Sequence, residues 1–200
     1  MIEYIKGTIA ELTPARMVLE CYGIGYEINI SLTTFSAFQG KDECKVFIYE
    51  VIREDAHLLF GFAEPVEREL FLLLTSVSGV GPNTARMILS SLQPAELIRV
   101  IATRDDRSLT AVKGIGTKTA EHIVVDLKNK VKQVEGLVAA DTSVVQRMTT
   151  ASSEVAEEAV AALVMLGFQK AASQKVVTAI LKEDPAMAVE KVVKEGLKRL

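Results

Sequence analysis

The first sixty residues alternate short runs of β-branched and aromatic side chains with clusters of turn residues. The clearest turn signals are Tyr22-Gly23-Ile24-Gly25 and Gln39-Gly40-Lys41-Asp42, because glycine and short polar residues accept the backbone angles of tight turns. This spacing predicts five or six short strands over residues 1–64, and hence a small β-barrel of the OB-like or the SH3-like kind. The apolar strand positions are Val18, Leu19, Tyr26, Ile28, Ile30, Val46, Phe47, Ile48, Tyr49, Val51 and Ile52.

One predicted hairpin of this barrel has an acidic tip. The segment from Val51 to Phe60 places Arg53, Glu54 and Asp55 between two apolar runs. Acidic residues at a hairpin tip are usually only solvated, and composition alone favours that interpretation. His57, just beyond the tip, is expected to be an ordinary strand residue.

From residue 65 onward the apolar spacing becomes that of helices. Ser108 is expected to cap a short helix that leads into Gly114, and the next helix is predicted from Thr117 to about Val131. Five helices within residues 65–134 predict a compact all-α domain. Prolines stand at three of the predicted helix starts, where no backbone N–H is needed: Pro65, Pro82 and Pro94.

Residues 135–152 are rich in small and polar side chains and lose the helical spacing, which predicts a flexible linker. Helical spacing returns over residues 153–200 as three short helices. Their small core favours a docking module over a catalytic domain. The turn Leu166-Gly167-Phe168 resembles that of ubiquitin-associated (UBA) three-helix domains.

Within this last segment, the limits of the helices follow from single residues. Ser153 is expected to cap the first helix and Gly167 to end it, and Asp184-Pro185 is expected to start the third. The predicted buried face of the first helix consists of Ala156, Val160, Leu163 and Val164.

Two segments of the central region are near copies, 35 residues apart. They are Val77-Ser78-Gly79-Val80-Gly81-Pro82-Asn83-Thr84-Ala85 and Val112-Lys113-Gly114-Ile115-Gly116-Thr117-Lys118-Thr119-Ala120. Each places Gly-aliphatic-Gly between the end of one helix and the start of the next, which predicts a hairpin of two helices. A single Gly-x-Gly is often only a tight turn, but two copies in matching context favour a shared function.

The chemistry of these turns points to a nucleic-acid backbone. Glycine permits positive φ and close approach of another backbone, and the N–H groups that follow belong to the positive end of a new helix. Phosphate is the anion that such paired helix starts would bind. The candidate DNA-binding residues are Gly79, Val80, Gly81, Asn83, Thr84, Gly114, Ile115, Gly116, Thr117, Lys118 and Thr119, with Val80 and Ile115 expected to anchor their turns in the core.

The net charge bears on DNA binding only when it is counted separately for each segment of the chain. The net charge of the whole chain is −3, which by itself argues against a nucleic-acid partner. Residues 1–63 carry a net −4, residues 64–133 a net +2 and residues 134–200 a net −1. The positive segment is the one that contains both glycine turns, so the net charge does not exclude DNA binding.

The amino-acid composition argues against a membrane protein, a secreted protein and a metal-binding protein. The apolar fraction of 49% is that of a globular protein, and the chain has neither an apolar run of 18 residues nor the layout of a signal peptide, so a cytoplasmic protein without a membrane partner is expected. Cys21 and Cys44 are the only cysteines; their spacing suits no zinc or iron–sulfur site, and buried free thiols are expected.

No catalytic residue, cofactor site or metal site is predicted. The segment Gly114-Ile115-Gly116-Thr117-Lys118-Thr119 lacks the spacing of an ATP-binding phosphate loop. A repair glycosylase or nuclease remains an alternative, as does a generic helix-hairpin-helix DNA-binding protein. The nearest acidic pair, Asp105-Asp106, is expected to terminate a helix rather than to hold a metal.

Taken together, the barrel, the acidic tip, the two glycine turns, the linker and the tail resemble the RuvA family of Holliday-junction-binding proteins from the bacterial branch-migration machinery. The resemblance rests on residues 51–62, 78–82, 114–121 and 158–168. It implies an α+β multidomain fold with an N-terminal OB-like β-barrel, a central all-α tandem helix-hairpin-helix domain, and a C-terminal three-helix, UBA-like domain.

The same resemblance implies a function. Family members hold an open four-way DNA junction as a fourfold-symmetric homotetramer, and two acidic residues, here Glu54 and Asp55, form a pin at its centre. The tail, residues 153–200, would contact a RuvB-type hexameric ATPase, so this chain would be a non-catalytic subunit. A tetramer or an octamer on DNA, and a RuvC-type resolvase as a further partner, both stay open.

This chain departs from the common family pattern at two positions. Relatives often carry lysine where this sequence has Asn83, and a lysine pair where it has Thr117-Lys118. Both Asn83 and Thr117 still offer hydrogen-bond donors to a phosphate, yet neither supplies charge. The salt dependence of DNA binding is therefore expected to be shallower than in lysine-rich relatives.

Overall fold

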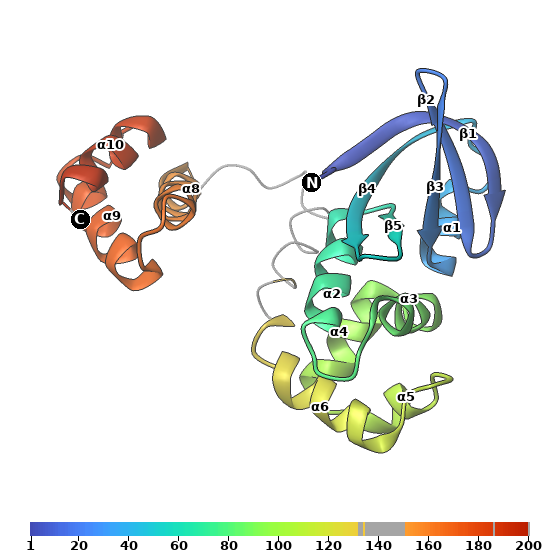
Figure 1. Cartoon of the computed structure of the whole chain (residues 1–200). Helices are drawn as coiled ribbons and strands as arrows, with labels where there is room; N and C mark the ends of the chain where they lie inside the picture. The colour runs from blue at the N-terminus through green and yellow to red at the C-terminus, as the bar shows by residue number, and fades with distance from the viewer. Residues whose placement is uncertain (132–133, 135–150, 186, 200) are drawn as a thin grey trace. The chain divides into compact units, whose positions relative to one another are not determined.

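The computed structural model of this protein describes residues 1–131, 134, 151–185 and 187–199 (Figure 1). By their contacts the residues form two compact units, Met1–Thr142 and Ser143–Leu200. The first unit contains the β-barrel and the central helices, and the second contains the last three helices.

Five strands close into a barrel at the N-terminal end: β1 (Tyr4–Thr13), β2 (Arg16–Cys21), β3 (Ile24–Ile30), β4 (Glu43–Ile52) and β5 (His57–Phe62). Their order around the barrel is β1-β2-β3-β5-β4, and among these described strands only β3 and β5 pair in parallel. A closed five-stranded barrel confirms the predicted fold and fits its OB-like form. His57 is the first residue of β5, as expected of a strand residue.

Side chains alternate between the barrel interior and solvent, as the pleat of a strand requires. Met17 and Leu19 of β2 and Ile28 and Ile30 of β3 are all fully buried. Gly61 of β5 belongs to this core for a steric reason. A Cβ at this position would lie 2.5 Å from Ile28 Cγ2 and 2.7 Å from a methyl group of Val46, so only glycine fits there.

A short helix, α1 (Leu32–Phe38), connects β3 to β4. Ser31 caps it by accepting a hydrogen bond from the Thr34 N–H at 3.0 Å. The apolar spacing did not predict this helix, whereas the five strands agree with the five or six that it predicted. Helix α1 takes part in long-range contacts with α3, which local spacing does not encode.

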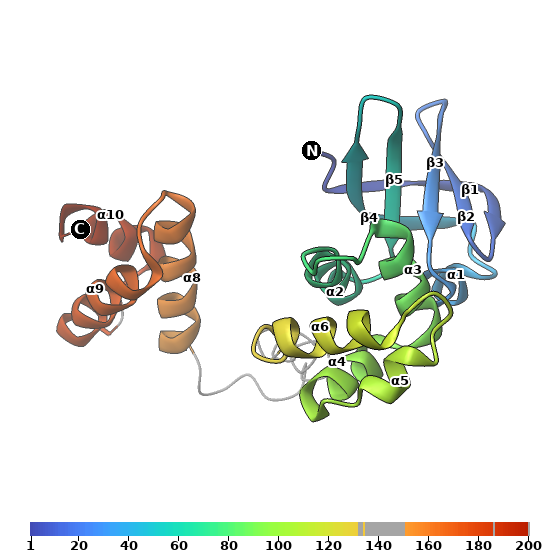
Figure 2. The same cartoon turned by 60° about the horizontal axis from the view of Figure 1, so that its bottom comes forward.

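The central helices are α2 (Pro65–Thr75), α3 (Pro82–Ser91), α4 (Pro94–Thr103), α5 (Asp106–Thr110) and α6 (Thr117–Leu127). The three predicted proline starts are confirmed. The helix from Thr117 ends at Leu127 rather than at about Val131. Figures 1 and 2 agree that α2 and α3 lie next to the barrel, whereas α5 and α6 lie on the far side of the unit.

Asp105, and not Ser108, caps α5. The Asp105 carboxylate accepts hydrogen bonds from the Ser108 backbone N–H at 3.2 Å and from the Ser108 hydroxyl at 2.6 Å, and these bonds lower the pKa of Asp105. Ser108 is the third residue of the helix, so it supplies the N–H that a cap must satisfy. The acidic pair Asp105-Asp106 therefore starts a helix instead of terminating one.

One apolar core joins the barrel to the central helices. Phe60 and Phe62 of β5 pack on Phe71 of α2, with ring centroids 5.2 and 4.9 Å apart. All three rings are almost completely buried, and aromatic pairs at such distances contribute about 0.5–1.5 kcal/mol beyond their buried area. The barrel and helical parts of the first unit therefore hold a fixed mutual orientation.

The second unit consists of α8 (Ala151–Met165), α9 (Lys170–Glu183) and α10 (Val189–Arg199). Gly167, with φ +98°, ends the first helix as predicted. Two other limits were wrong, because α8 begins at Ala151 instead of Ser153 and α10 begins at Val189 instead of at Asp184-Pro185. Val164, which was predicted on the buried face of the first helix, is exposed. The buried core consists of Ala159, Leu163, Val177, Ile180 and Val192.

The predicted linker falls mostly on residues 135–150, which lie outside the described residues, while residues 151 and 152 belong to α8. In the described part of the chain, no helix has the length and apolar character needed to cross a membrane.

Candidate nucleic-acid interface

The first glycine turn joins α2 to α3. The Val77 N–H donates to the Leu74 carbonyl and the Val80 N–H to the Val77 carbonyl, both at 3.1 Å. Gly79 has φ +86°, a conformation that costs other residues free energy. Gly81 then precedes α3 with an extended backbone, φ −85° and ψ 171°.

The second glycine turn repeats this geometry 35 residues later, between α5 and α6. Equivalent hydrogen bonds run from Val112 to Leu109 and from Ile115 to Val112, again at 3.1 Å. Gly114 has φ +90°, and Gly116 precedes α6 with φ −84° and ψ 164°. The two predicted helix-hairpin-helix copies are thus copies in backbone conformation as well as in sequence.

The flanking helices follow the same 35-residue offset. Between Leu74 and Leu92, each buried position has a buried apolar counterpart in the second hairpin: Leu74 and Leu109, Val77 and Val112, Val80 and Ile115, Ala85 and Ala120, Ile88 and Ile123, Leu89 and Val124, and Leu92 and Leu127. Val80 and Ile115 are 5% and 6% exposed, so their side chains anchor the turns, as expected, and only their backbones are available to a ligand.

The second glycine of each turn has no explanation within the fold. Gly81 and Gly116 have φ values that any residue adopts, and apart from the adjoining residues of the chain nothing lies within 4 Å of the place where a Cβ would stand at either one. Side chains at these positions would therefore fit the protein itself. Because Gly81 and Gly116 have no side chains, their backbone is uncovered on the outer surface, and another chain can approach it closely.

Both turns present uncapped helix starts. Neither α3 nor α6 has a side-chain hydrogen bond at its first turn, so the N–H groups of Asn83 and Thr84, and those of Thr117, Lys118 and Thr119, lack partners within their helices. The side chains of Asn83, Thr117 and Lys118 are exposed, while those of Thr84 and Thr119 are half-buried. The predicted contact residues thus lie at two uncapped helix starts, which is the kind of position that can bind an anion.

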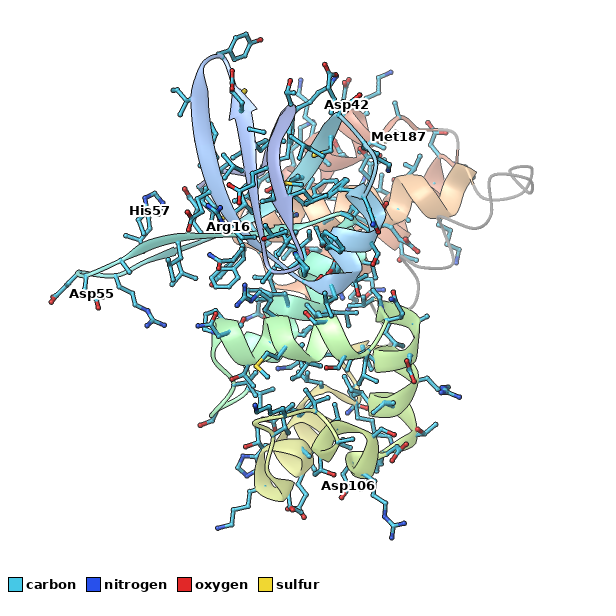
Figure 3. The ribbon with its side chains drawn as sticks, turned by 90° about the vertical axis from the view of Figure 1, so that its right-hand side faces the viewer. Arg16, Asp42, Asp55, His57, Asp106 and Met187 are labelled. Carbon is cyan, nitrogen blue, oxygen red and sulfur yellow. The ribbon has the colours of Figure 1, made fainter. Side chains whose placement is uncertain are left out.

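The acidic tip projects from the barrel. The Arg53 N–H donates to the Ala56 carbonyl at 2.8 Å and closes the turn between β4 and β5. Glu54 and Asp55 are exposed, and Figure 3 shows Asp55 at the outer end of a hairpin that extends well beyond the rest of the barrel. Ile52 is 72% exposed beside the tip, so this hairpin has no packing partner there among the described residues of its own unit.

A buried carboxylate ties α1 to α2, the helix that leads to the first glycine turn. Glu67 of α2 is 1% exposed and accepts hydrogen bonds from the hydroxyls of Ser31 and, at 2.7 Å, of Thr34. Burial raises the pKa of Glu67 even though these bonds oppose that effect. Sequence reasoning missed this residue. The available signal was its spacing of 3, 4 and 7 residues from Leu70, Phe71 and Leu74, which places it on the apolar face of α2.

Further polar contacts join α1 to α3. The Thr33 hydroxyl donates to the Leu89 carbonyl at 2.7 Å, and the Leu32 N–H donates to the Ser90 hydroxyl at 3.1 Å. Arg86 of α3 donates to the Ala15 carbonyl at 2.9 Å, and its partial burial lowers its pKa. These bonds fix the barrel, with its acidic tip, relative to the helix that begins at the first glycine turn.

The described residues contain no group of three His, Cys, Asp or Glu side chains arranged to hold a metal ion. Both cysteines are free; Cys44 is buried, which raises the pKa of its thiol to about 11, whereas Cys21 is only half-buried. His57 lies 3.5 Å from a carboxylate oxygen of Glu50.

Comparison with known proteins agrees with this architecture. Residues 1–61 match the RuvA N-terminal domain, residues 71–130 match the SAM-like tandem helix-hairpin-helix, and residues 154–200 match the RuvA C-terminal domain. The first and last of these matches coincide with the barrel and the three-helix unit.

Full-length relatives extend the comparison to the whole chain. The chain is 67% identical to the Holliday junction branch migration complex subunit RuvA of Parabacteroides distasonis, 60% identical to that of Bacteroides thetaiotaomicron and 52% identical to that of Porphyromonas gingivalis, each over 100% of both chains. By this similarity, and by the barrel, the paired glycine turns and the three-helix unit, the chain belongs to the RuvA family.

Proposed function

We propose that this protein is the junction-binding subunit of a branch-migration complex in the bacterial cytoplasm. It holds a four-way DNA junction open and recruits a RuvB-type hexameric ATPase, which supplies the ATP hydrolysis that this chain does not perform. The observation that carries the proposal is the pair of equivalent glycine turns, each with an uncovered glycine backbone and an uncapped helix start, in one unit with a projecting acidic hairpin.

The glycine turns hold the sugar–phosphate backbone of a DNA arm. Backbone N–H groups at the starts of α3 and α6 donate to phosphate oxygens, and the helix dipoles favour the negative charge. Such contacts fix the position of the DNA without reading its bases. A protein that acts on junctions of any sequence requires this kind of binding.

The acidic tip acts at the centre of the junction. Glu54 and Asp55 are exposed at the end of the hairpin, where they repel phosphates with about 1 kcal/mol per pair of charges at about 4 Å in water. Four copies around a fourfold axis multiply this repulsion. Continuous duplex across the centre is therefore disfavoured, and strands that separate there are kept apart.

The three-helix unit docks the ATPase, while the first unit holds the DNA. A homotetramer places one barrel and two glycine turns on each of the four arms. An octamer, formed by two tetramers on opposite faces of the junction, and a RuvC-type resolvase are further arrangements compatible with this assignment.

A reconstituted branch-migration assay tests the proposal. A mobile four-way junction is incubated with the RuvB-type ATPase, ATP and the protein, and its conversion into separated arms is followed on native gels. The wild-type chain should support migration. A variant lacking residues 151–200 should bind the junction normally and support no migration, and migration by that variant would contradict the role of the tail.

A separate variant tests the role of the acidic tip. Glu54→Gln with Asp55→Asn removes two negative charges from an exposed tip, so junction binding should be kept or become tighter while the rate of migration changes. Loss of DNA binding in this variant would mean that the two carboxylates support the fold or contact the DNA favourably.

A further inference from the structure

A groove of about 530 Å³ lies between the acidic hairpin and the first glycine turn. One wall is the end of β4, from Tyr49 to Ile52, with Arg53 directly after it, and the other is formed by the C-terminal end of α2 together with Val80 and Pro82. Its volume is within the range of about 300–1,000 Å³ that is usual for ligand-binding clefts. The groove touches both features that we assign to junction binding.

Arg53 supplies a positive charge at this groove. Among the described residues its guanidinium makes no ion pair or hydrogen bond, and only its backbone N–H is engaged, with the Ala56 carbonyl. The side chain is exposed and directly precedes Glu54. Arg53 lines the same groove as Pro82, the first residue of α3, so a cation next to the acidic pair faces this groove.

The other charged group in the groove is already compensated. The Glu50 carboxylate is 12% exposed, lies 3.5 Å from His57 Nε2 and 3.9 Å from the N-terminal amine, and accepts a hydrogen bond from the Ile2 N–H at 3.0 Å. The hydroxyls of Thr75 and Ser76 line the opposite wall. The free charge that faces an incoming ligand is thus that of Arg53.

We propose that this groove takes the sugar–phosphate backbone of a junction strand between the first glycine turn and the acidic tip, and that Arg53 binds a phosphate there. The inference rests on the proposed function. A strand that leaves the uncapped start of α3 at Pro82 enters the groove directly, because Pro82 belongs to both. Arg53 then binds the strand next to the acidic tip. Attraction by Arg53 and repulsion by Glu54 and Asp55 together determine where the strand turns.

Salt titration of DNA binding measures this contact. Each phosphate contact with a cation contributes about 0.7–0.9 to the slope of log K against log salt concentration. Arg53→Gln should reduce that slope for a four-way junction by about this amount per bound chain and leave the slope for linear duplex unchanged, because duplex does not reach the tip. Arg53→Lys should restore the wild-type junction slope.

Lys41→Gln is the matched control, since it removes one positive charge from the same barrel. In Figure 3 its neighbour Asp42 lies at the end of the barrel away from Asp55. This variant should bind junction and duplex with wild-type slopes. An unchanged junction slope for Arg53→Gln, or an equal fall with Lys41→Gln, would overturn the inference.

A chemical substitution on the DNA locates the contact. A junction with neutral methylphosphonates at the crossover should weaken the binding of the wild-type chain but not further weaken that of Arg53→Gln. Additive losses would place Arg53 elsewhere. The wild-type preference for junction over duplex, measured in the same series, is the separate test of the proposed function: its absence would contradict that function, whereas its presence with additive losses contradicts only the groove.

Discussion

Replacing Gly81 and Gly116 together by alanine should weaken DNA binding without weakening the fold. Both residues have φ near −85°, and apart from the adjoining residues of the chain no atom lies within 4 Å of the place that the new methyl carbon would take. At such sites Gly→Ala stabilises by about 0.4–1 kcal/mol through the unfolded chain. Alanine directly before a helix is poorer than glycine by roughly 0.5–1 kcal/mol, so the two effects nearly cancel.

The expected loss of binding is much larger. A methyl group at each position would keep a phosphate from the N–H groups at the starts of α3 and α6. Hydrogen bonds to a charged group contribute about 1.5–3 kcal/mol each, and about 1.4 kcal/mol corresponds to a tenfold change in affinity. The double variant should therefore bind a four-way junction at least about tenfold more weakly.

Two measurements separate stability from binding. Thermal unfolding without DNA should give a melting temperature within about 2 °C of wild type, and fluorescence anisotropy with a labelled junction gives the affinity. Gly79→Ala is the contrasting variant. At φ +86° alanine costs roughly 1–2 kcal/mol, which should lower the melting temperature by at least about 2 °C.

Unchanged junction affinity in the Gly81→Ala, Gly116→Ala protein would refute the assignment of these turns as the DNA-binding surface. The open space beside both glycines would then have no functional consequence.

Three other variants test separate parts of the molecule. Glu67→Gln should remove a pH dependence of stability: the pKa of Glu67 is raised in the folded state, so the folded state binds the proton more tightly and wild-type stability should fall as pH rises from the unfolded value through the folded one. Urea unfolding of both proteins across this interval measures the effect, and parallel curves would contradict it. Asn83→Lys with Thr117→Lys should steepen the salt dependence of junction binding by about 0.9 per added phosphate contact, whereas identical slopes would show that these positions do not face the DNA. Leu163→Ala removes a fully buried side chain from the three-helix unit at a cost of about 2–5 kcal/mol; it should abolish stimulation of the ATPase and spare junction binding, and a loss of junction binding would mean that the two units are not independent.

The paired glycine turns could be predicted because their requirements are local. Gly79 and Gly114 need positive φ, and Pro82 and Thr117 begin helices, all within a few residues of sequence. The 35-residue repeat added independent support, since one Gly-x-Gly alone is compatible with a simple turn. Local constraints of this kind can be recognised directly from the residue types in the sequence.

The contacts that orient the site could not be predicted in the same way. The Ser31 hydroxyl meets Glu67 across 36 residues of sequence, and the Thr33 hydroxyl meets the Leu89 carbonyl across 56. The short helix α1 that carries Thr33 follows a cap but has no long apolar periodicity. Its position depends on these distant partners, and only the folded chain brings them together.

Predictions of helix limits were wrong where more than one nearby residue could cap or start the helix. Asp105 and Ser108 both have side chains that cap helices, and the carboxylate three residues ahead of the Ser108 N–H takes the role. Asp184-Pro185 has the pattern of a helix start, yet α10 begins at Val189. Composition near a helix end identifies candidate caps, but tertiary packing selects among them.

We propose above all that this protein recognises the branched form of DNA. The most direct measurement is the equilibrium affinity of the wild-type chain for a four-way junction and for linear duplex with the same arm sequences at the same salt concentration. The proposed arrangement, with two glycine turns on each arm and an acidic tip that disfavours continuous duplex, predicts at least about tenfold tighter binding to the junction. Equal affinities would contradict the claim and leave a protein that binds DNA backbone of any shape.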